Sequence, residues 1–191
     1  MIGAATVAGD ERLRLFLALE LPDDVRASLR SWAQAHLRGG RLPAELHVTL
    51  AFLGSQQRSD LERILRTLRE AAAEAAPFTL EPVRYRETRS VGMLVLTDPS
   101  GEATRLADRL QRRLEELGLY TRERRPWLPH VTVVRFRKRL GLVPPLPEVG
   151  PFAPSGAAAF LSCLHPSGAR YEVLESCPLG ASHPRVSHSK G

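Results

Sequence analysis

The pattern His-x-Thr, followed by an aliphatic residue, occurs twice in this chain and constrains its fold more than any other feature. The first copy is His47-Val48-Thr49-Leu50 and the second is His130-Val131-Thr132-Val133. Both copies lie in apolar stretches that predict strands, and residues i and i+2 of a strand point to the same face. The histidine and threonine of each copy therefore project together, while their aliphatic neighbours face a core.

The elements around the two copies repeat as well. A strand, a helix and the motif strand follow one another from residues 13 to 53 and again from 91 to 136. Because hairpins occur beside these units, the order predicts an α+β fold with largely antiparallel sheets and two similar halves. We expect helices after Pro22, over 59–76 and over 102–117, and strands over 12–22, 45–54, 78–87, 90–98, 128–138, 157–166 and 169–176.

The chain of 191 residues matches one domain, which the repeat divides into two lobes. We expect a flexible leader over 1–11, a single domain over 12–180 and a disordered tail over 181–191. No stretch is long and apolar enough to span a membrane, and the first residues lack the basic and apolar regions of a secretory signal. Cys163 and Cys177 are too few for a disulfide framework, so we expect free thiols in the cytoplasm. We further expect a monomer.

The basic residues favour a phosphate-bearing partner. The net charge is +6, and all but two of the 27 basic residues are arginine. A guanidinium holds phosphate oxygens in a two-pronged geometry, and a basic surface attracts polyanions. The scarcity of lysine leaves almost no candidate for lysine-adenylate or Schiff-base chemistry.

The two His-x-Thr pairs are the candidate catalytic residues. A catalytic zinc usually takes three protein ligands and threonine is a poor one, so we expect no metal. The sequence also lacks the G-x-S-x-G, H-E-x-x-H and phosphate-cradling glycine motifs. Two histidines that face each other suit paired catalysis, in which one imidazole removes a proton from a nucleophile and the other protonates the leaving group. Two threonine hydroxyls can bind the oxygens of a phosphate diester held between them.

Three further residues are candidates for this cleft. Arg135 lies five positions after His130, so strict alternation would turn it away, and it needs its length, a bulge or the strand end to reach a phosphate. Phe16 could stack on a base or pack in the core, and Trp127 could line the rim or be structural. The remaining histidines have no partner in the sequence and are assigned to the surface or the tail: His36, His165, His183 and His188.

With these residues in place, the sequence resembles the two-histidine (2H) phosphoesterases. Among them it is most similar to the bacterial and archaeal RNA 2′,3′-cyclic phosphodiesterases, also called 2′-5′ RNA ligases of the LigT type. The matching stretches are 14–22, 46–54, 128–136 and 171–179. The resemblance implies a bilobal, pseudo-symmetric α+β fold, with two largely antiparallel sheets flanked by helices and the active cleft between the lobes. It implies no metal and no cofactor.

The resemblance also implies an activity and a set of site residues. His47 and His130 would be catalytic, and Thr49, Thr132 and Arg135 would bind the phosphate. The reaction would open RNA or nucleotide 2′,3′-cyclic phosphate ends to 2′-phosphates, with His47 protonating O3′ and His130 activating water. The residues themselves leave the order of the two histidines open.

Two other functions stay open from the sequence. One is ATP-independent joining of a cyclic phosphate end to a 5′-hydroxyl through a 2′-5′ linkage, and the other is an RNA-end-binding module without turnover. The proline-rich connector over 140–156 and the basic segment 122–125 depart from the family pattern. We expect them to reshape one wall of the cleft.

Overall fold

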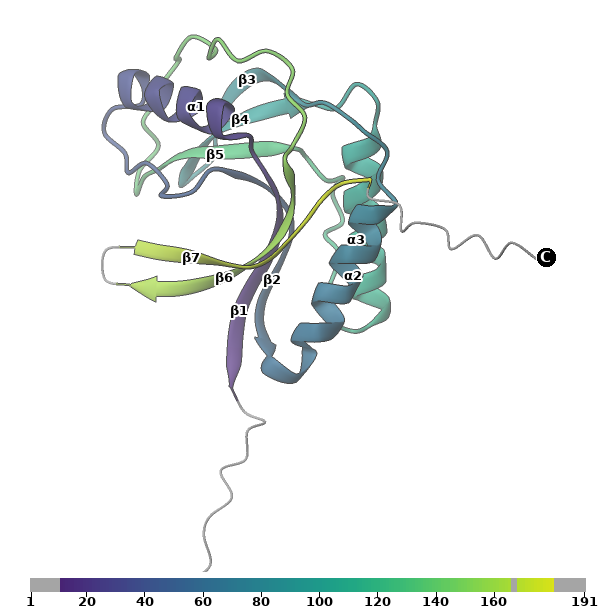
Figure 1. Ribbon diagram of the computed structural model, residues 1–191. Helices are drawn as coiled ribbons and strands as arrows, with labels where there is room; N and C mark the ends of the chain where they lie inside the picture. The colour runs from purple at the N-terminus through teal and green to yellow at the C-terminus, as the bar shows by residue number, and fades with distance from the viewer. Residues whose placement is uncertain (1–10, 166–167, 181–191) are drawn as a thin grey trace, which may run out of the picture.

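The structure is a computed structural model that describes residues 11–165 and 168–180. Within these residues, seven strands form one antiparallel sheet in the order β3-β4-β5-β2-β1-β6-β7, accompanied by three α-helices (Figure 1). The expected helices and strands are all present, with ends shifted by a few residues. Their bounds are β1 (Arg12–Glu20), α1 (Asp23–His36), β2 (His47–Gln57), α2 (Leu61–Ala73), β3 (Glu81–Glu87), β4 (Val91–Thr97), α3 (Glu102–Glu116), β5 (His130–Arg135), β6 (Gly156–His165) and β7 (Gly168–Cys177).

The repeat predicted from the sequence is visible as two halves of this sheet. One half is built on β1-α1-β2 and the other on β4-α3-β5, and in each the first strand pairs with the motif strand. The expectation of two separate sheets is wrong in one respect, because the halves are joined between β2 and β5. In the described chain that junction pairs a single couple of residues, Val48 with Val131. The two lobes therefore meet at the centres of the two His-x-Thr motifs.

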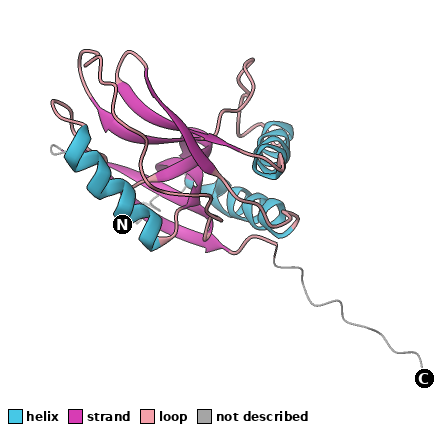
Figure 2. Ribbon diagram, turned by 90° about the horizontal axis from the view of Figure 1, so that it is seen from above, coloured by secondary structure: helices cyan, strands magenta, loops and turns pink. Residues whose placement is uncertain are grey.

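One face of the sheet carries the main core. Leu15, Leu17 and Leu19 of β1 are fully buried there, which confirms the period-two pattern of leucines. Fully burying a leucine side chain stabilises the fold by about 1.5–3 kcal/mol. The helices cross between the halves, since α1 contacts β5, α3 contacts β2, and α2 contacts β6 and β7. Figure 2 shows one helix apart from the other two, with the strands running between them.

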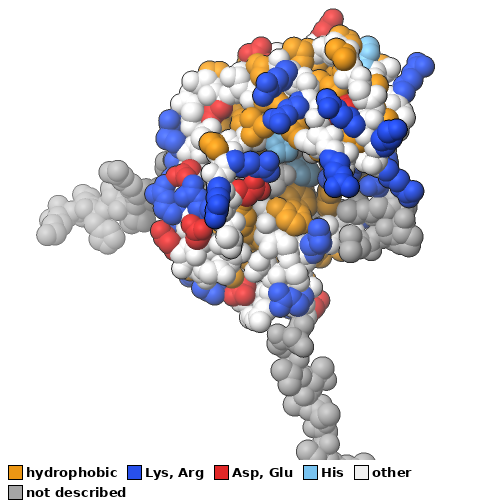
Figure 3. All heavy atoms as spheres, turned by 180° about the vertical axis from the view of Figure 1, so that it is seen from behind, with side chains coloured by type: hydrophobic (Ala, Val, Ile, Leu, Met, Phe, Trp, Pro, Cys, Tyr) orange, Lys and Arg blue, Asp and Glu red, His pale blue; other side chains and the backbone are white. Residues whose placement is uncertain are grey.

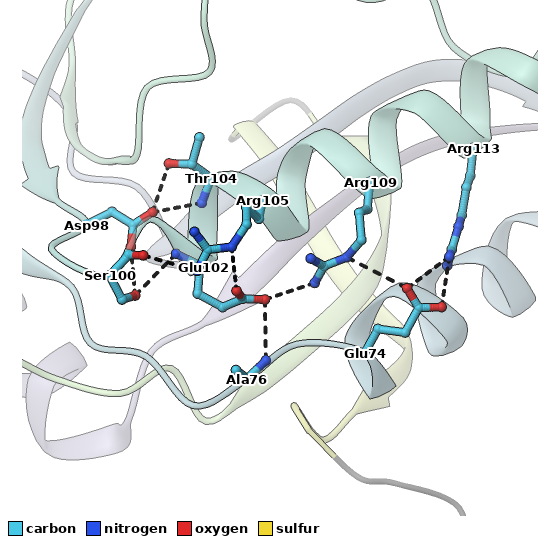
Figure 4. Close-up of polar contacts among 9 residues, drawn as sticks. All are labelled: Glu74, Ala76, Asp98, Ser100, Glu102, Thr104, Arg105, Arg109 and Arg113. Atoms are coloured by element: carbon cyan, nitrogen blue, oxygen red, sulfur yellow. Dashed lines mark hydrogen bonds and ion pairs between the residues drawn. The ribbon is translucent and has the colours of Figure 1, made fainter.

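A cluster of ion pairs fastens α3 to the end of α2 (Figure 4). The nearly buried carboxylate of Glu102 accepts hydrogen bonds from Arg105 at 2.8 Å, Arg109 at 3.0 Å and the backbone N–H of Ala76 at 3.3 Å. Burial acts to raise the pKa of Glu102, but the bonds from Arg109 and Arg105 hold it below its ordinary value. Glu74, at the end of α2, accepts two further bonds from Arg113. The cluster fixes the helix that leads to the loop before β5.

The proline-rich connector packs on the outside of one lobe. The Trp32 side chain of α1 donates to the carbonyl oxygen of Pro145 at 2.9 Å, and Leu80 and Phe152 exchange two backbone hydrogen bonds. The expectation that the connector reshapes the cleft is therefore wrong, because the connector packs against α1 and the start of β3 instead.

In the described chain, no helix is long and apolar enough to cross a membrane.

Most of the expected leader and tail lie outside the described residues, as do Pro166 and Ser167 of the predicted hairpin turn. Glu11, the last residue assigned to the leader, is described. Its carbonyl oxygen accepts a hydrogen bond of 2.9 Å from the Arg58 backbone, and its carboxylate pairs with the same arginine. Glu11 is therefore attached to the domain through both its backbone and its side chain.

Candidate active site

The pairing of Val48 with Val131 brings the four motif side chains together. Both valines are fully buried, so the residues on either side of each valine point to the opposite face of the sheet. In this antiparallel register His47 lies beside Thr132, and Thr49 lies beside His130. Cross-strand neighbours on one face have Cβ atoms about 5 Å apart, and diagonal neighbours about 7–8 Å. The two histidines occupy diagonal corners, which leaves room for a phosphate between their rings.

A β-bulge turns Arg135 onto the same face. In the register between β4 and β5, Gly92 pairs with Val134 and Met93 pairs with Thr132, so Val133 is an extra residue. Val133 and Val134 are consequently both buried, and the alternation is reversed after them. Of the three ways in which Arg135 could reach the cleft, the bulge is the one that the backbone adopts.

The first motif strand contains the matching bulge. Between β1 and β2, Ala18 pairs with Thr49 and Leu17 pairs with Ala51, so Leu50 is the extra residue. The next side chain on the site face is Phe52, which remains 49% exposed. Phe52 therefore occupies, five positions after His47, the place that Arg135 occupies after His130. Sequence reasoning missed Phe52, because strict alternation assigns it to the core with Val48 and Leu50.

His47 is enclosed by aromatic rings. Its ring centroid lies 4.8 Å from Phe16, 5.8 Å from Phe160 and 5.7 Å from Tyr171. Phe16 is 3% exposed and stacks on Phe160 at 4.8 Å, so it packs under the histidine and is not available to stack on a base. These rings form a small second core on the site face of the sheet.

The enclosure determines the charge of His47. Burial lowers its pKa from 6.5 to about 4, and the positive charges of Arg135 and His130 act in the same direction. Its Nδ1 is buried and has no hydrogen-bond partner among the described residues. Because the imidazolium form needs acceptors for two N–H groups, this missing partner also disfavours the cation. In the unliganded protein, His47 is neutral at neutral pH.

His130 has the opposite arrangement. Its Nδ1 lies 2.8 Å from the carbonyl oxygen of Leu128, which can only accept a hydrogen bond. Nδ1 therefore carries a proton, and in the neutral ring the lone pair is on Nε2. His130 is thus a ring with a fixed tautomer that presents a basic nitrogen.

Two cavities adjoin the histidines. One, of about 530 Å³, lies on the His47 side, and it is lined by Arg14, Arg41, Phe52, Arg135, Ser162 and Tyr171. The other, of about 890 Å³, includes Thr49 and His130 in its wall. Phe52 borders both, with the Arg14 guanidinium 5.0 Å above its ring. Figure 3 shows histidine side chains in the middle of this face, surrounded by Lys and Arg side chains and by hydrophobic groups.

The loop before β5 supplies one wall of the larger cavity. Trp127 lines it and donates its indole N–H to the carbonyl oxygen of Thr49 at 2.9 Å, so the ring connects the two motif strands. Glu123 and Arg125 of the basic segment line the same wall. The expectation that this segment shapes the cleft is therefore confirmed, and Trp127 has both of the roles considered for it.

In the part of the chain that the structure describes, no further histidine side chain and no cluster of metal ligands joins this site. His36 is exposed on α1, the side chain of His165 is not described, and His183 and His188 lie outside the described residues. Among residues 11–165 and 168–180, no group of three or more His, Cys, Asp or Glu side chains could hold a metal ion. The described thiols of Cys163 and Cys177 are free.

The chain matches a known family over most of its length. The family model for the 2′-5′ RNA ligase superfamily matches residues 21–168. This chain belongs to that superfamily. It is 32% identical to an RNA 2′,3′-cyclic phosphodiesterase of Thermus thermophilus over 91% of this chain and 93% of the relative. An RNA 2′,3′-cyclic phosphodiesterase of Escherichia coli is 30% identical over 71% of this chain and 78% of the relative.

Solved structures of this superfamily have the same fold. The crystal structure of the Thermus thermophilus protein TT0787 aligns with a TM-score of 0.74 and 31% identity, over 90% of this chain and all of that one. The Escherichia coli LigT crystal structure complexed with 3′-AMP aligns with a TM-score of 0.76 and 25% identity, over 88% and 99% of the two chains. The LigT-like, pseudo-symmetric α+β fold expected from the sequence is therefore confirmed.

Proposed function

We propose that this protein hydrolyses 2′,3′-cyclic phosphate ends of RNA or nucleotides to 2′-phosphates without a metal. The observation that carries the proposal is the pairing of the two His-x-Thr motifs at Val48 and Val131. This pairing places the two histidines and the two threonines on one face of the sheet, with the imidazoles diagonally opposite each other. Relatives named RNA 2′,3′-cyclic phosphodiesterase support the same reaction. We further propose a cytoplasmic monomer, since free thiols suit a reducing compartment.

His130 is the general base in this mechanism. Its Nδ1–H is engaged by the Leu128 carbonyl, so Nε2 can take a proton from water as the water oxygen attacks phosphorus. The bond between phosphorus and O3′ breaks on the opposite side, and His47 donates a proton to O3′. The product carries a 2′-phosphate and a free 3′-hydroxyl.

His47 must be protonated for this role, whereas its pKa is about 4 in the unliganded protein. The cyclic phosphate carries a negative charge, and that charge offsets the neighbouring Arg135 and His130. Binding of the anion therefore raises the pKa of His47 in the complex. The bound substrate therefore favours the protonated form of His47, the residue that later donates a proton to the leaving group.

The remaining residues hold the phosphate between the rings. The hydroxyls of Thr49 and Thr132 donate hydrogen bonds to the oxygens that do not react. Arg135 can bind two of those oxygens at once, and this contact strengthens as negative charge builds up on them. Binding that increases in the transition state accelerates the chemical step.

The test is turnover of cytidine 2′,3′-cyclic phosphate in excess EDTA, with the product compared with authentic 2′- and 3′-phosphates. We expect the 2′-phosphate, formed at the same rate with and without the chelator. His47→Ala and His130→Ala serve as inactive controls. Retention of the ligand without turnover would support the RNA-end-binding module instead, and a 3′-phosphate product would mean that the other ester bond is cleaved.

A further inference from the structure

The first motif strand is held by two side chains of the opposite lobe. In the described chain β2 and β5 pair at a single couple of residues, so the ladder between the lobes stops there. The indole N–H of Trp127 donates to the carbonyl oxygen of Thr49 at 2.9 Å, and the side-chain amide of Gln111 donates to that of Leu50 at 2.7 Å. These two bonds hold the peptide groups before and after Leu50, which is the extra residue of the bulge.

Gln111 is a polar exception on the buried face of α3. Leu106, Leu110 and Leu114 of that face are fully buried, as the helical spacing predicts. Gln111 lies among them with only 8% of its surface exposed, and its amide crosses from α3 to β2. A bulge leaves its extra residue unpaired in the ladder, and a buried carbonyl without a donor destabilises a fold. Gln111 supplies the donor that Leu50 needs.

The bulge of the second motif strand is held by a backbone segment instead. The loop after α1 brings Arg41 beside Arg135, and the two residues exchange backbone hydrogen bonds of 2.8 and 2.9 Å. A Cβ on Gly40 would lie 2.3 Å from the side chain of Val134, so this loop packs directly against the bulge. Each bulge is thus held by the opposite lobe, but the contact at β2 depends on side chains and can be removed by a substitution.

We propose that Gln111 is a positioning residue, which holds the bulge of β2 in the form that directs the Thr49 hydroxyl at the bound phosphate. This inference rests on the proposed function, in which that hydroxyl donates to an oxygen of the cyclic phosphate. Without the amide of Gln111, the peptide group after Leu50 can rotate and turn the threonine away, and small displacements of this kind slow a reaction. Gln111 also lines the larger cavity together with Thr49 and His130, so it lies at the wall of the site.

The experiment replaces the amide with side chains of similar size that cannot donate a hydrogen bond. Gln111→Leu and Gln111→Met both suit a buried helical position, and they differ in shape, so a defect common to both comes from the lost donor. Gln56→Leu is the matched control. Gln56 lies on the same strand and donates to the carbonyl oxygens of Leu53 at 2.7 Å and Leu119 at 3.2 Å, but it lines neither cavity. Urea unfolding measures the stability that each variant loses.

We expect kcat on a cyclic-phosphate oligonucleotide to fall about tenfold in both Gln111 variants and to change by less than about twofold in Gln56→Leu. Thr49→Val tests whether this loss acts through the threonine. In that background Gln111→Leu should lower kcat by less than about twofold more, whereas in Thr132→Val it should keep its full effect. An unchanged kcat in Gln111→Leu overturns the proposal. An equal loss in both threonine backgrounds overturns it as well, because Gln111 would then support the whole site and not Thr49.

Hydrogen exchange separates the positioning role from the proposed function. The protein has two tryptophans, Trp32 and Trp127, so ¹⁵N labelling gives two indole N–H signals, which Trp127→Phe assigns. Because Trp127 donates to the carbonyl of Thr49, its exchange with solvent reports whether that peptide group stays in place. We expect the Trp127 indole to exchange about tenfold faster in Gln111→Leu and at the wild-type rate in Gln56→Leu, with Trp32 unchanged in both.

The two measurements fail independently. An unchanged exchange rate of the Trp127 indole in Gln111→Leu overturns the positioning role whether or not the protein turns over a cyclic phosphate. Faster exchange in a protein that has no turnover would reject only the proposed reaction, because Gln111 would still hold the backbone at Thr49.

Discussion

The two His-x-Thr strands share one backbone design but differ in what surrounds each histidine. Both carry a bulge directly after the threonine, at Leu50 and Val133, and both turn the fifth residue after the histidine onto the site face. His47 is enclosed by rings and lacks a partner for Nδ1 among the described residues, whereas the Nδ1 of His130 is bonded to a carbonyl. A symmetric framework thus holds two imidazoles in different environments, which is what a base and an acid in one reaction require.

The largest expected effect concerns the two histidines themselves. His47→Ala and His130→Ala should each lower kcat on a cyclic phosphate by about 10²–10⁴-fold, the usual contribution of a general acid or base. An aryl diester such as bis(4-nitrophenyl) phosphate distinguishes the acid from the base, because its leaving group needs no proton. On that substrate the kcat of His47→Ala should approach that of the wild type, whereas the kcat of His130→Ala should remain low. Recovery in His130→Ala alone would exchange the two roles.

The comparison also separates what the sequence predicts from what it does not. The repeat, the leucine face of β1 and the shared face of the histidine and threonine within each motif follow from local periodicity, which survives in the folded chain. The bulges depend on which residues pair across strands, and alternation within one strand contains no information on that pairing. Gly92 is the sequence signal that could have indicated the bulge in β5, since a glycine inside a strand often marks a bulge. The structure agrees, because a Cβ at position 92 would lie 2.6 Å from the side chain of Val134.

Other features could be recognised only after the halves were assembled. The aromatic enclosure of His47 draws on β1, β6 and β7, which are far apart in the sequence. Phe52 becomes a site residue only through the bulge at Leu50. The single sheet follows from one pair of residues, Val48 and Val131, which strand prediction cannot supply.

A second effect, smaller than the first, distinguishes Arg135 from its counterpart Phe52. Arg135→Lys should lower kcat by about tenfold to a hundredfold, because a lysine offers one point charge where the guanidinium can hold two phosphoryl oxygens. Phe52→Leu should act mainly on KM, since an uncharged side chain cannot stabilise charge that develops at phosphorus. Steady-state kinetics on a cyclic-phosphate oligonucleotide measures both. An unchanged kcat in Arg135→Lys and Arg135→Ala would remove Arg135 from the reaction.

A third effect appears in the pH dependence. The kcat/KM profile reports the free protein, in which the pKa of His47 is about 4, and the kcat profile reports the complex. If His47 is the acid, the alkaline limb of kcat/KM should lie at lower pH than that of kcat, because the bound anion raises the pKa of His47. In Arg135→Ala the free-protein limb should move upward, since one charge that lowers this pKa is gone. Superimposable limbs in the wild type would argue against protonation assisted by the substrate.

The smallest expected effect concerns stability instead of rate. The folded pKa of His47, about 4, lies below its ordinary value of 6.5, so the unfolded chain binds a proton more readily than the folded one. The free energy of unfolding is therefore unaffected by His47 above pH 6.5, and it falls as the pH is lowered from about 6.5 towards 4, by about 1–3 kcal/mol in all.

Urea unfolding of wild type and His47→Gln between pH 4 and 7.5 measures this difference, with His36→Gln as the exposed control. Glu102 and other carboxylates with lowered pKa values also destabilise the fold in acid, but they do so equally in all three proteins. The wild type and His36→Gln should hence lose stability more steeply than His47→Gln, and parallel curves would show that the aromatic enclosure does not hold His47 neutral.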